Sequence, residues 1–384
     1  MRAKSDLPVV AATCALLATA CADPVVPTSS MSVGDALGGA DTGFARAVAP
    51  PDLRFPRDHG AHPEFRTEWW YVTGNLDAAD GKRFGVQLVF FRQALAANVP
   101  ARPANAAARD VILAHAALTD VDGDRHFAEE RTGRLAGGMA ELRGPDEGGF
   151  RAVCADWSAV AVAEGDGFLP LDLRAGGRGF AFDLRVGPGK PPVLQGDRGL
   201  SRKGDEPGNA SIYYSMTRVP IEGTVRVSGA PLAVRGLAWI DREWSTSALG
   251  RDQVGWDWFS LQLDDGTDLM LYQLRKRDGS IDANSRGAIV GADGRIEVLP
   301  PGALVATPSG EWTARDGGAR YPARWRLTST SPPLDLEVTP LRADQELRVL
   351  VRYWEGAVAV RGNLGGAAVA GRGYLEMTGY TTAR

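Results

Sequence analysis

Apolar and polar residues alternate along much of the chain with a period of two, which is typical of β-strands with one buried face. The alternation is clear over residues 168–173, 179–186 and 334–338. Other runs, such as residues 86–91, are apolar at almost every position, which indicates strands covered on both faces. No long 3.6-residue apolar period of the helical kind occurs. Because an antiparallel barrel accommodates both kinds of strand, the sequence predicts an all-β fold.

Seven Asp-Gly pairs mark the expected turns between these strands. An Asp-Gly pair between two apolar runs is a strong hairpin signal, because its residues readily adopt positive φ angles. The pairs begin at Asp80, Asp122, Asp166, Asp265, Asp278, Asp293 and Asp316. Hairpins joined in series predict antiparallel meanders.

Residues 69–92 can be laid over residues 256–275 as a weak internal repeat. The overlay places Trp69 on Trp256 and Tyr71 on Trp258, and an Asp-Gly turn follows each pair. A chain of 384 residues is also too long for one ordinary core. We therefore expect two barrel domains in tandem, residues 51–244 and 245–384, with the boundary near Trp244.

The first 21 residues have the pattern of an export signal. Arg2 and Lys4 precede an apolar run over residues 7–20, and residues 17–21 resemble a bacterial lipobox. This pattern predicts lipidation of Cys21 and a periplasmic, membrane-anchored lipoprotein, with ordinary cleavage or no cleavage as the alternatives. Residues 22–50, rich in Pro, Ser, Gly and Ala, then form a flexible tether. Cys154, the thiol left in the folded part, is expected in the core.

Charge and motifs exclude several classes of function. The net charge is −4 and acidic and basic residues are interspersed, so no nucleic acid partner is expected. The sequence has no P-loop, Gly-x-Ser-x-Gly elbow or dinucleotide fingerprint, which argues against common kinases, hydrolases and dehydrogenases, and no cofactor is expected. His59, His62 and Glu64 could offer metal ligands, but Gly60 and Pro63 favour a turn. We predict no metal site and interpret the histidines as polar fillers at a barrel mouth, together with His115.

Aromatic pairs are the first candidates for a ligand site. Because neighbours in a strand alternate faces, Trp69 and Tyr71 share one face, and Trp256 and Trp258 share the corresponding face of the second repeat. They are expected to line one side of each barrel, either plugging a barrel end or lining a ligand cavity.

The segment Asp241-Arg-Glu-Trp244 is the densest polar cluster beside an apolar strand. In extended conformation, Asp241 and Glu243 lie on one face, and Arg242 and Trp244 on the other. One interpretation is catalytic, because an acid buried beside Trp rings has a raised pKa and can donate a proton. The alternative is structural, with these charges in a surface or interdomain salt bridge.

Residues 55–76 resemble the signature of the AttH / CrtC family, the lipocalin-like carotenoid 1,2-hydratase (hydroxyneurosporene synthase) proteins. Further matches follow in the same order at residues 114–120, 199–204, 213–215, 241–245, 255–259 and 373–380. They cover nearly the whole chain after residue 50. The resemblance implies two lipocalin-like antiparallel β-barrels, in agreement with the internal repeat.

The resemblance leaves two functions open. AttH-like members are exported proteins associated with ABC transporter components, so the leading hypothesis is binding of a hydrophobic small molecule. The alternative is a carotenoid 1,2-hydratase-like lyase, or a cofactor-free isomerase or cyclase, with Asp241, Glu243 or Asp257 as the acid. Carotenoid hydratases carry His at the position of Arg242, which counts against hydration. The ligand-binding candidates are Glu68, Trp69, Tyr71, His115, Arg242, Trp244, Trp256 and Trp258.

Overall fold

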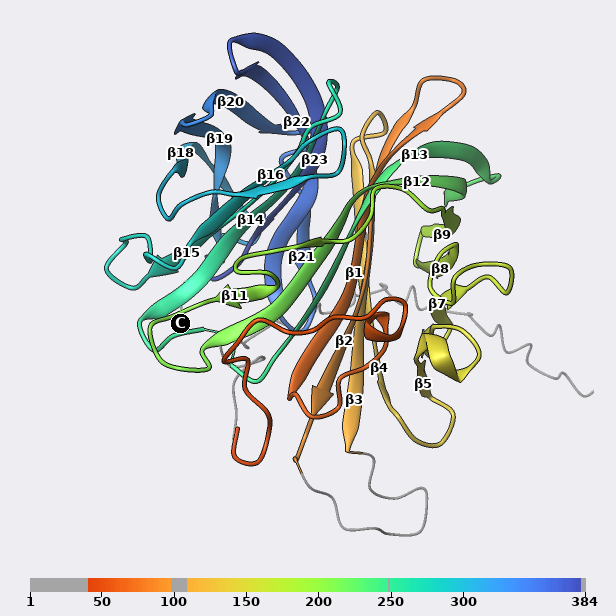
Figure 1. Cartoon of the computed structure of the whole chain (residues 1–384). Helices are drawn as coiled ribbons and strands as arrows, with labels where there is room; N and C mark the ends of the chain where they lie inside the picture. The colour runs from red at the N-terminus through yellow and green to blue at the C-terminus, as the bar shows by residue number, and fades with distance from the viewer. Residues whose placement is uncertain (1–40, 98–108, 248, 381–384) are drawn as a thin grey trace, which may run out of the picture.

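The computed structural model describes residues 41–97, 109–247 and 249–380, which form two antiparallel sheets (Figure 1). The predicted all-β fold is confirmed. The helices within the described ranges are two short 3-10 turns, η1 (Arg57–His59) and η2 (Pro145–Glu147). None of the helices in these ranges has the length and hydropathy needed to cross a membrane.

The first sheet curls into a nearly closed barrel. Its main path runs β4-β3-β2-β1-β13-β12-β9-β8-β7-β6-β5, and the short strands β10 and β11 pair with β12. The two edge strands, β4 and β5, lie in contact with each other. The strands are β1 (Thr67–Ala78), β2 (Arg83–Ala94), β3 (Asp110–Asp120), β4 (Arg125–Arg134), β5 (Ala140–Arg143), β6 (Arg151–Cys154), β7 (Trp157–Ala161), β8 (Leu171–Gly177), β9 (Phe180–Val186), β10 (Val193–Leu194), β11 (Leu200–Arg202), β12 (Ala210–Val227) and β13 (Leu232–Ser245).

The second sheet repeats this plan with fewer strands. Its main path runs β17-β16-β15-β14-β23-β22-β20-β19-β18, so its first strand again pairs with its last. The strands are β14 (Gln253–Leu263), β15 (Asp268–Lys276), β16 (Arg286–Val290), β17 (Ile296–Val298), β18 (Leu304–Thr313), β19 (Arg320–Thr330), β20 (Pro333–Pro340), β21 (Glu346–Arg348), β22 (Arg352–Leu364) and β23 (Ala367–Met377). Strands β1 and β14 thus occupy equivalent places, as the internal repeat predicts.

All seven Asp-Gly pairs lie in connections between consecutive strands. Gly81 in the β1–β2 turn and Gly266 in the β14–β15 turn have φ angles of 86° and 89°. A side chain at these positions would be strained, which explains the use of glycine. The Asp-Gly pairs read from the sequence therefore mark seven of the turns between neighbouring strands.

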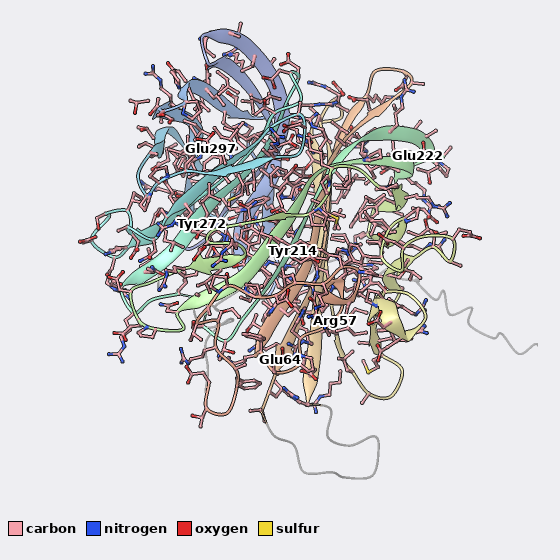
Figure 2. The ribbon with its side chains drawn as sticks, viewed as in Figure 1. Arg57, Glu64, Tyr214, Glu222, Tyr272 and Glu297 are labelled. Atoms are coloured by element: carbon pink, nitrogen blue, oxygen red, sulfur yellow. The ribbon has the colours of Figure 1, made fainter. Side chains whose placement is uncertain are left out.

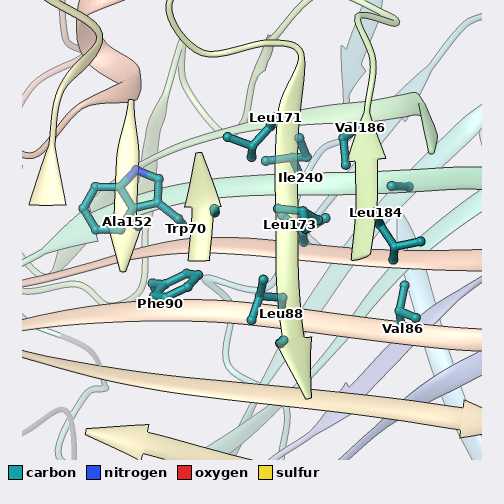
Figure 3. Close-up of a cluster of buried hydrophobic side chains, with 14 of the residues drawn as sticks. Trp70, Val86, Leu88, Phe90, Ala152, Leu171, Leu173, Leu184, Val186 and Ile240 are labelled. Atoms are coloured by element: carbon teal, nitrogen blue, oxygen red, sulfur yellow. The ribbon is translucent and has the colours of Figure 1, made fainter. Parts of the chain in front are cut away.

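Each sheet encloses its own apolar core. In the first barrel, Trp70, Leu88 and Phe90 pack against Leu171 and Leu173 from the opposite wall (Figure 3). In the second, the edge of Phe259 contacts Trp325 with ring centroids 5.3 Å apart. Each fully buried large side chain contributes about 1.5–3 kcal/mol to folding. Cys154 is buried in the first core, as predicted.

The two barrels pack against each other through their outer faces. Strands β1 and β2 contact β23 and β22, and β12 contacts β14. One buried ion cluster joins the barrels, because the Asp268 carboxylate accepts hydrogen bonds from Arg218 at 2.6 Å and Lys190 at 2.8 Å. The first sheet ends at Ser245 and the second begins at Gln253.

Part of the predicted tether belongs to the folded body. Ala47 is buried in the first core, and the Ala45 N–H donates to the Glu64 carbonyl oxygen at 2.9 Å. The composition of residues 22–50 suggested a flexible tether, but residues 41–50 are held by these contacts. The predicted signal, Cys21 and residues 22–40 lie outside the described residues.

Candidate functional site

The first wall of the candidate site is the outer face of the first barrel. In β1 and β13, Tyr71 is the cross-strand partner of Asp241, and Trp69 is the partner of Glu243. In β12, Tyr213 is the partner of Glu243. Cross-strand partners share a face, so these five side chains point the same way, toward the second barrel.

The second wall is the outer face of the second barrel. Glu376 in β23 is the cross-strand partner of both Trp258 in β14 and Glu355 in β22. Trp258 also pairs with Tyr272 in β15, which lies near β11 of the first barrel (Figure 2). The Tyr272 hydroxyl is 2.8 Å from Ser201 Oγ in β11, so the two barrels meet directly at this wall.

A cavity of about 100 Å³ lies between the two walls. Its lining combines aromatic rings with four carboxyl groups and a single lysine. The lining residues are Thr67, Trp69, Tyr71, Phe91, Lys203, Ser211, Tyr213, Asp241, Glu243, Ser245, Ser247, Leu249, Trp256, Trp258, Tyr272, Leu274, Tyr353, Glu355 and Glu376.

Asp241 is buried on the first wall among neutral hydrogen-bond donors. Its carboxyl accepts hydrogen bonds from the Tyr213 hydroxyl at 2.6 Å, Ser215 Oγ at 2.6 Å and Trp239 Nε1 at 2.7 Å. No ion pair reaches it within the described part of the chain. Burial raises the pKa of Asp241 to about 7, although the three donors favour the ionised form. Asp241 can therefore hold a proton near neutral pH.

Glu355 and Glu376 form a pair of acids on the second wall. Glu355 accepts hydrogen bonds from the Tyr71 hydroxyl and from Gln87 Nε2, while Glu376 accepts one from Trp256 Nε1 at 3.1 Å. Burial raises the pKa of both, and the charge of Glu376 raises the pKa of Glu355 further. Because two adjacent buried carboxylates repel each other, the pair retains protons.

Glu243 differs from these three acids because it has a cationic partner. Lys203 Nζ is 3.1 Å from Glu243 Oε1, and Ser211 Oγ donates to the same oxygen. The Lys203 ammonium also lies 3.9 Å from the ring centroid of Tyr272, in a cation–π contact. Burial opposes the charge of Lys203, but Glu243 raises its pKa. Lys203 therefore stays a cation beside Glu243.

Glu68, Arg242 and Trp244 point away from the cavity, into the mouth of the first barrel. Arg242 Nη2 donates to Glu68 Oε1 at 2.8 Å, and its guanidinium lies 4.0 Å from the Trp70 ring centroid. Trp244 stacks on His62 with ring centroids 3.7 Å apart. The predicted alternation along residues 241–244 is correct, but these three candidates do not line the cavity.

Asp257 and His115 also lie outside the cavity lining. Asp257 lies on the opposite face of β14 from Trp256 and Trp258. Arg275 Nε and Gln273 Nε2 each donate a hydrogen bond to it there at 3.1 Å. His115 lies behind the cavity wall, with its Nδ1 2.7 Å from the hydroxyl of the lining residue Tyr353. The sequence offered all of these side chains as candidates for binding or catalysis, and the fold distributes them over both faces of the sheets.

The four aromatic candidates Trp69, Tyr71, Trp256 and Trp258 do meet at one cavity. They line one side of each barrel, as expected, but this side is the outer face, so they line a cavity between the barrels and do not plug a barrel end. Their neighbours Trp70 and Phe259 fill the two barrel interiors. Both faces of these strands are apolar, so the pattern could not reveal which face is enclosed.

His59, in the first 3-10 turn, and His62, just after it, do not converge on a common point. His59 Nδ1 lies 2.6 Å from the Tyr214 hydroxyl, while His62 Nδ1 lies 2.8 Å from Glu68 Oε1. Glu64 is exposed. Across residues 41–97, 109–247 and 249–380, no group of three His, Cys, Asp or Glu side chains is arranged to hold a metal ion.

Glu355, Glu376, Tyr213 and Lys203 were not identified as site residues from the sequence. Two of them carried a signal, since Glu355 and Glu376 are single acids within otherwise apolar strand segments. An acid in that context is costly to bury unless it has a function or a partner. Their convergence with Asp241 depends on how the two barrels pack.

This arrangement is suited to acid–base chemistry on an apolar molecule. Three protonated or readily protonated carboxyl groups face a cavity whose walls are Trp and Tyr rings. Such acids can donate a proton near neutral pH, and aromatic faces stabilise a developing positive charge. Glu243, whose carboxylate is paired with the Lys203 ammonium, is the candidate proton acceptor.

Comparisons with known proteins agree with the fold. The AttH-like family model matches residues 46–380. A crystal structure of an AttH protein from Nitrosomonas europaea is 34% identical, with a TM-score of 0.76, and the match covers 88% of this chain and 100% of that one. No curated protein matches the sequence.

Two more distant solved structures share the fold. Kievitone hydratase from Nectria haematococca is 17% identical, with a TM-score of 0.66, over 89% of this chain and 97% of that one. CghA, solved with Sch210972, is 14% identical, with a TM-score of 0.52, over the same shares of the two chains. At these identities the likeness shows the architecture alone.

Proposed function

Because the chain belongs to the AttH-like family, we propose that the cavity between its two barrels binds a hydrophobic small molecule and transfers protons to and from it without a cofactor. One observation carries this proposal. Asp241, Glu355 and Glu376 converge on an aromatic cavity with neutral hydrogen-bond donors and no cationic partner in the described residues. Burying such groups costs stability, which a structural role does not explain.

Hydration of an alkene is the reaction type that these residues fit best. In this mechanism the protonated Asp241 carboxyl donates its proton to one alkene carbon, and positive charge forms on the other carbon. The rings of Trp258 and Tyr71 stabilise that charge. A water molecule then forms the new C–O bond, and the Glu243 carboxylate takes the proton that the water loses. The product gains one water, and return of a proton to Asp241 closes the cycle.

Arg242 stands where carotenoid hydratases carry His, but this difference does not argue against the proposal. Arg242 faces the mouth of the first barrel and pairs with Glu68, so the cavity acids are independent of it. The name of one structural neighbour, kievitone hydratase, agrees with the proposed reaction class.

The size of the cavity limits what it can enclose. Its volume of about 100 Å³ is well below the roughly 300–1,000 Å³ typical of pockets that enclose a drug-sized ligand. We therefore propose that the cavity holds only the reacting end of a longer molecule, such as the terminal alkene of a terpenoid.

Mass spectrometry tests the proposed activity. The purified protein is incubated with acyclic carotenoids and shorter acyclic terpenoid alkenes in ¹⁸O-labelled water, and products that gain one labelled water are measured. We expect Asp241→Asn, which removes the acid, and Glu243→Gln, which removes the base, each to lower turnover by about 100-fold or more, the usual contribution of a general acid or base. Asp257→Asn is the matched control, because Asp257 is equally buried but lies outside the cavity. Product formation that survives both cavity substitutions would contradict the acid assignment.

Binding without turnover is a second candidate function, favoured by the largely aromatic lining of the cavity. In this case the protein holds a lipid or terpenoid and delivers it to or from an ABC transporter. Native mass spectrometry after gentle extraction from the source membrane measures whether a lipophile copurifies. A Tyr71→Trp substitution, which fills cavity space, should then reduce its occupancy. A protein that carries no lipophile and binds none would argue against this function.

The proposed place of action is the cell envelope. The export signal and Cys21 lie outside the described residues, so this proposal rests on the sequence pattern alone. Metabolic labelling with radioactive palmitate should mark the wild-type protein and leave Cys21→Ser unlabelled. An unlabelled wild-type protein would favour ordinary cleavage, and cross-linking in intact cells measures contact with transporter components.

A further inference from the structure

His115 is a buried histidine that the proposed reaction leaves unused. It lies in β3 of the first barrel and is 2% exposed. Its Nδ1 is 2.7 Å from the hydroxyl of Tyr353, which lines the cavity. Its Nε2 has no hydrogen-bond partner among the described residues. A buried polar atom without a partner destabilises the fold, so this imidazole calls for an explanation other than packing.

The unpartnered nitrogen faces a carboxylate at the protein surface. Glu130 in β4 is the cross-strand partner of His115, and its Oε2 lies 3.8 Å from His115 Nε2. The Glu130 side chain is 35% exposed, so it exchanges protons freely with solvent. Glu130 Oε2 also accepts a hydrogen bond from the Leu350 backbone N–H at 2.9 Å, which holds this carboxylate beside His115.

The other end of the chain of groups reaches the buried acid pair. Gln87 Nε2 donates to the Tyr353 hydroxyl at 3.2 Å and to Glu355 Oε2 at 2.8 Å, so this one amide bridges the two oxygens. Both Tyr353 and Glu355 line the cavity. The groups therefore extend from solvent to the acids in the order Glu130, His115, Tyr353 and Glu355.

We propose that Glu130, His115 and Tyr353 form a proton relay that connects solvent with Glu355 in the cavity. This inference rests on the proposed function, because only a site that gains and loses protons needs such a connection. Glu355 is 1% exposed and lines the cavity, so a relay through the barrel wall gives it a route for proton exchange that stays open when a ligand fills the cavity.

The relay moves one proton without leaving a charge on the imidazole. A proton from Glu130 binds His115 Nε2, while the Nδ1 proton passes to the Tyr353 oxygen and the original Tyr353 hydroxyl proton passes to Glu355. The reverse sequence returns a proton to solvent. Burial lowers the pKa of His115 to about 3, which keeps the ring neutral between transfers. Phe91, whose ring contacts His115 edge-on, adds no charge.

His126 provides a matched control within the same barrel. It lies in β4 and is half-buried, its Nε2 is a buried atom without a hydrogen-bond partner among the described residues, and burial lowers its pKa to about 3 as well. Its Nδ1, however, is 2.9 Å from Thr119 Oγ1, and neither residue lines the cavity. Replacing His126 removes a similar side chain without interrupting the proposed path.

Time-resolved infrared spectroscopy tests the relay without a substrate. A laser pulse releases protons from a caged acid, and the carbonyl stretch of protonated carboxyl groups then reports the protonation of the cavity acids. Glu355→Gln identifies the contribution of Glu355. We expect His115→Phe and Tyr353→Phe to slow protonation of Glu355 by about tenfold or more, a modest loss for a proton-transfer group. The final amplitude at each pH should not change, and His126→Phe should match the wild type.

The outcomes separate the relay from the proposed function. A Glu355 band that titrates but forms equally fast in His115→Phe would overturn the relay and leave the proposed acid chemistry intact. A changed final amplitude in both Tyr353→Phe and His115→Phe would assign these residues a purely structural role and also overturn it. A wild-type protein without any titrating buried carboxyl group would remove both the proposed function and the relay.

Discussion

The two faces of strands β1 and β13 each bury acidic side chains, but the hydrogen-bond partners of Glu68 and Asp241 differ. On the inner face, Glu68 is bound by Arg242 at 2.8 Å, Arg92 at 3.1 Å and His62 at 2.8 Å. On the outer face, Asp241 receives only neutral donors. Burial would raise the pKa of Glu68, but its cationic partners hold it below its ordinary value, whereas the pKa of Asp241 is raised.

This difference separates structural charge from functional charge. The inner cluster closes the mouth of the first barrel, since Arg242 also donates to the carbonyl oxygens of Trp69 and Gly60. Every charge there has a partner, so the cluster is fixed. Three outer acids, Asp241, Glu355 and Glu376, lack cationic partners among the described residues, so burial lets them hold and give up a proton. Glu243, beside Lys203, is the exception. Substitutions that remove a partner on one face or an acid on the other test this division.

The largest expected effect comes from breaking the inner cluster. Arg242→Met leaves Glu68 buried with fewer cationic partners, and we expect the free energy of unfolding to fall by about 3–5 kcal/mol. Denaturant unfolding at pH 7 measures this loss. Arg185→Met is the control, since Arg185 forms an exposed pair with Asp172 and should cost less than about 1 kcal/mol. Similar losses for the two variants would contradict the distinction.

The next largest effect comes from the outer face, where removing a buried acid should raise the free energy of unfolding relative to wild type as the pH rises. Asp241 has a folded pKa of about 7, above its ordinary value of 3.8, so the folded state binds more protons than the unfolded state between these values. Its presence therefore destabilises the fold increasingly as the pH rises through this window. We expect the stability of Asp241→Asn relative to wild type to increase by roughly 2–3 kcal/mol between pH 5 and pH 8. A difference that is constant with pH would show that Asp241 is ionised throughout.

A smaller effect is expected from His62 on the inner face. Burial lowers its pKa, but Asp58 and Glu68 raise it above the ordinary value overall. Its stabilising contribution is therefore complete below pH 6.5 and is lost as the pH rises through the folded pKa. His62→Phe keeps the stacking on Trp244. It should lower the free energy of unfolding by about 1–2 kcal/mol at pH 6 and by less at pH 9. Thermal unfolding at both pH values measures the change, and a cost that grows with pH would contradict it.

The smallest effect should come from a paired but partly exposed charge between the barrels. Asp77 accepts two hydrogen bonds from Arg372, but the two side chains are 44% and 36% exposed. Asp77→Asn should lower stability by less than about 1 kcal/mol, because solvent screens the pair. Asp268→Asn, at the buried ion cluster between the barrels, should cost several times more. Equal losses of stability in the two variants would mean that burial does not determine how much these ion pairs stabilise the fold.

The sequence alone determined the local features of this protein. Strand alternation and seven Asp-Gly turns predicted the all-β fold, the internal repeat predicted that Trp69 and Trp256 occupy equivalent places, and the alternation at Asp241 and Arg242 was correct. These properties depend on residues that are neighbours in the chain or in one hairpin. Local geometry is sufficient for them, because the period of a strand is fixed by its backbone.

Only the tertiary structure decided where the candidate site lies. Strands β1 and β14 are apolar on both faces, so the sequence could not show that Trp70 faces the barrel interior while Tyr71 faces the other barrel. Glu355 and Glu376 meet Asp241 only because two separate sheets pack outer face to outer face. Such packing depends on the shapes of whole surfaces, and no spacing within one strand encodes it.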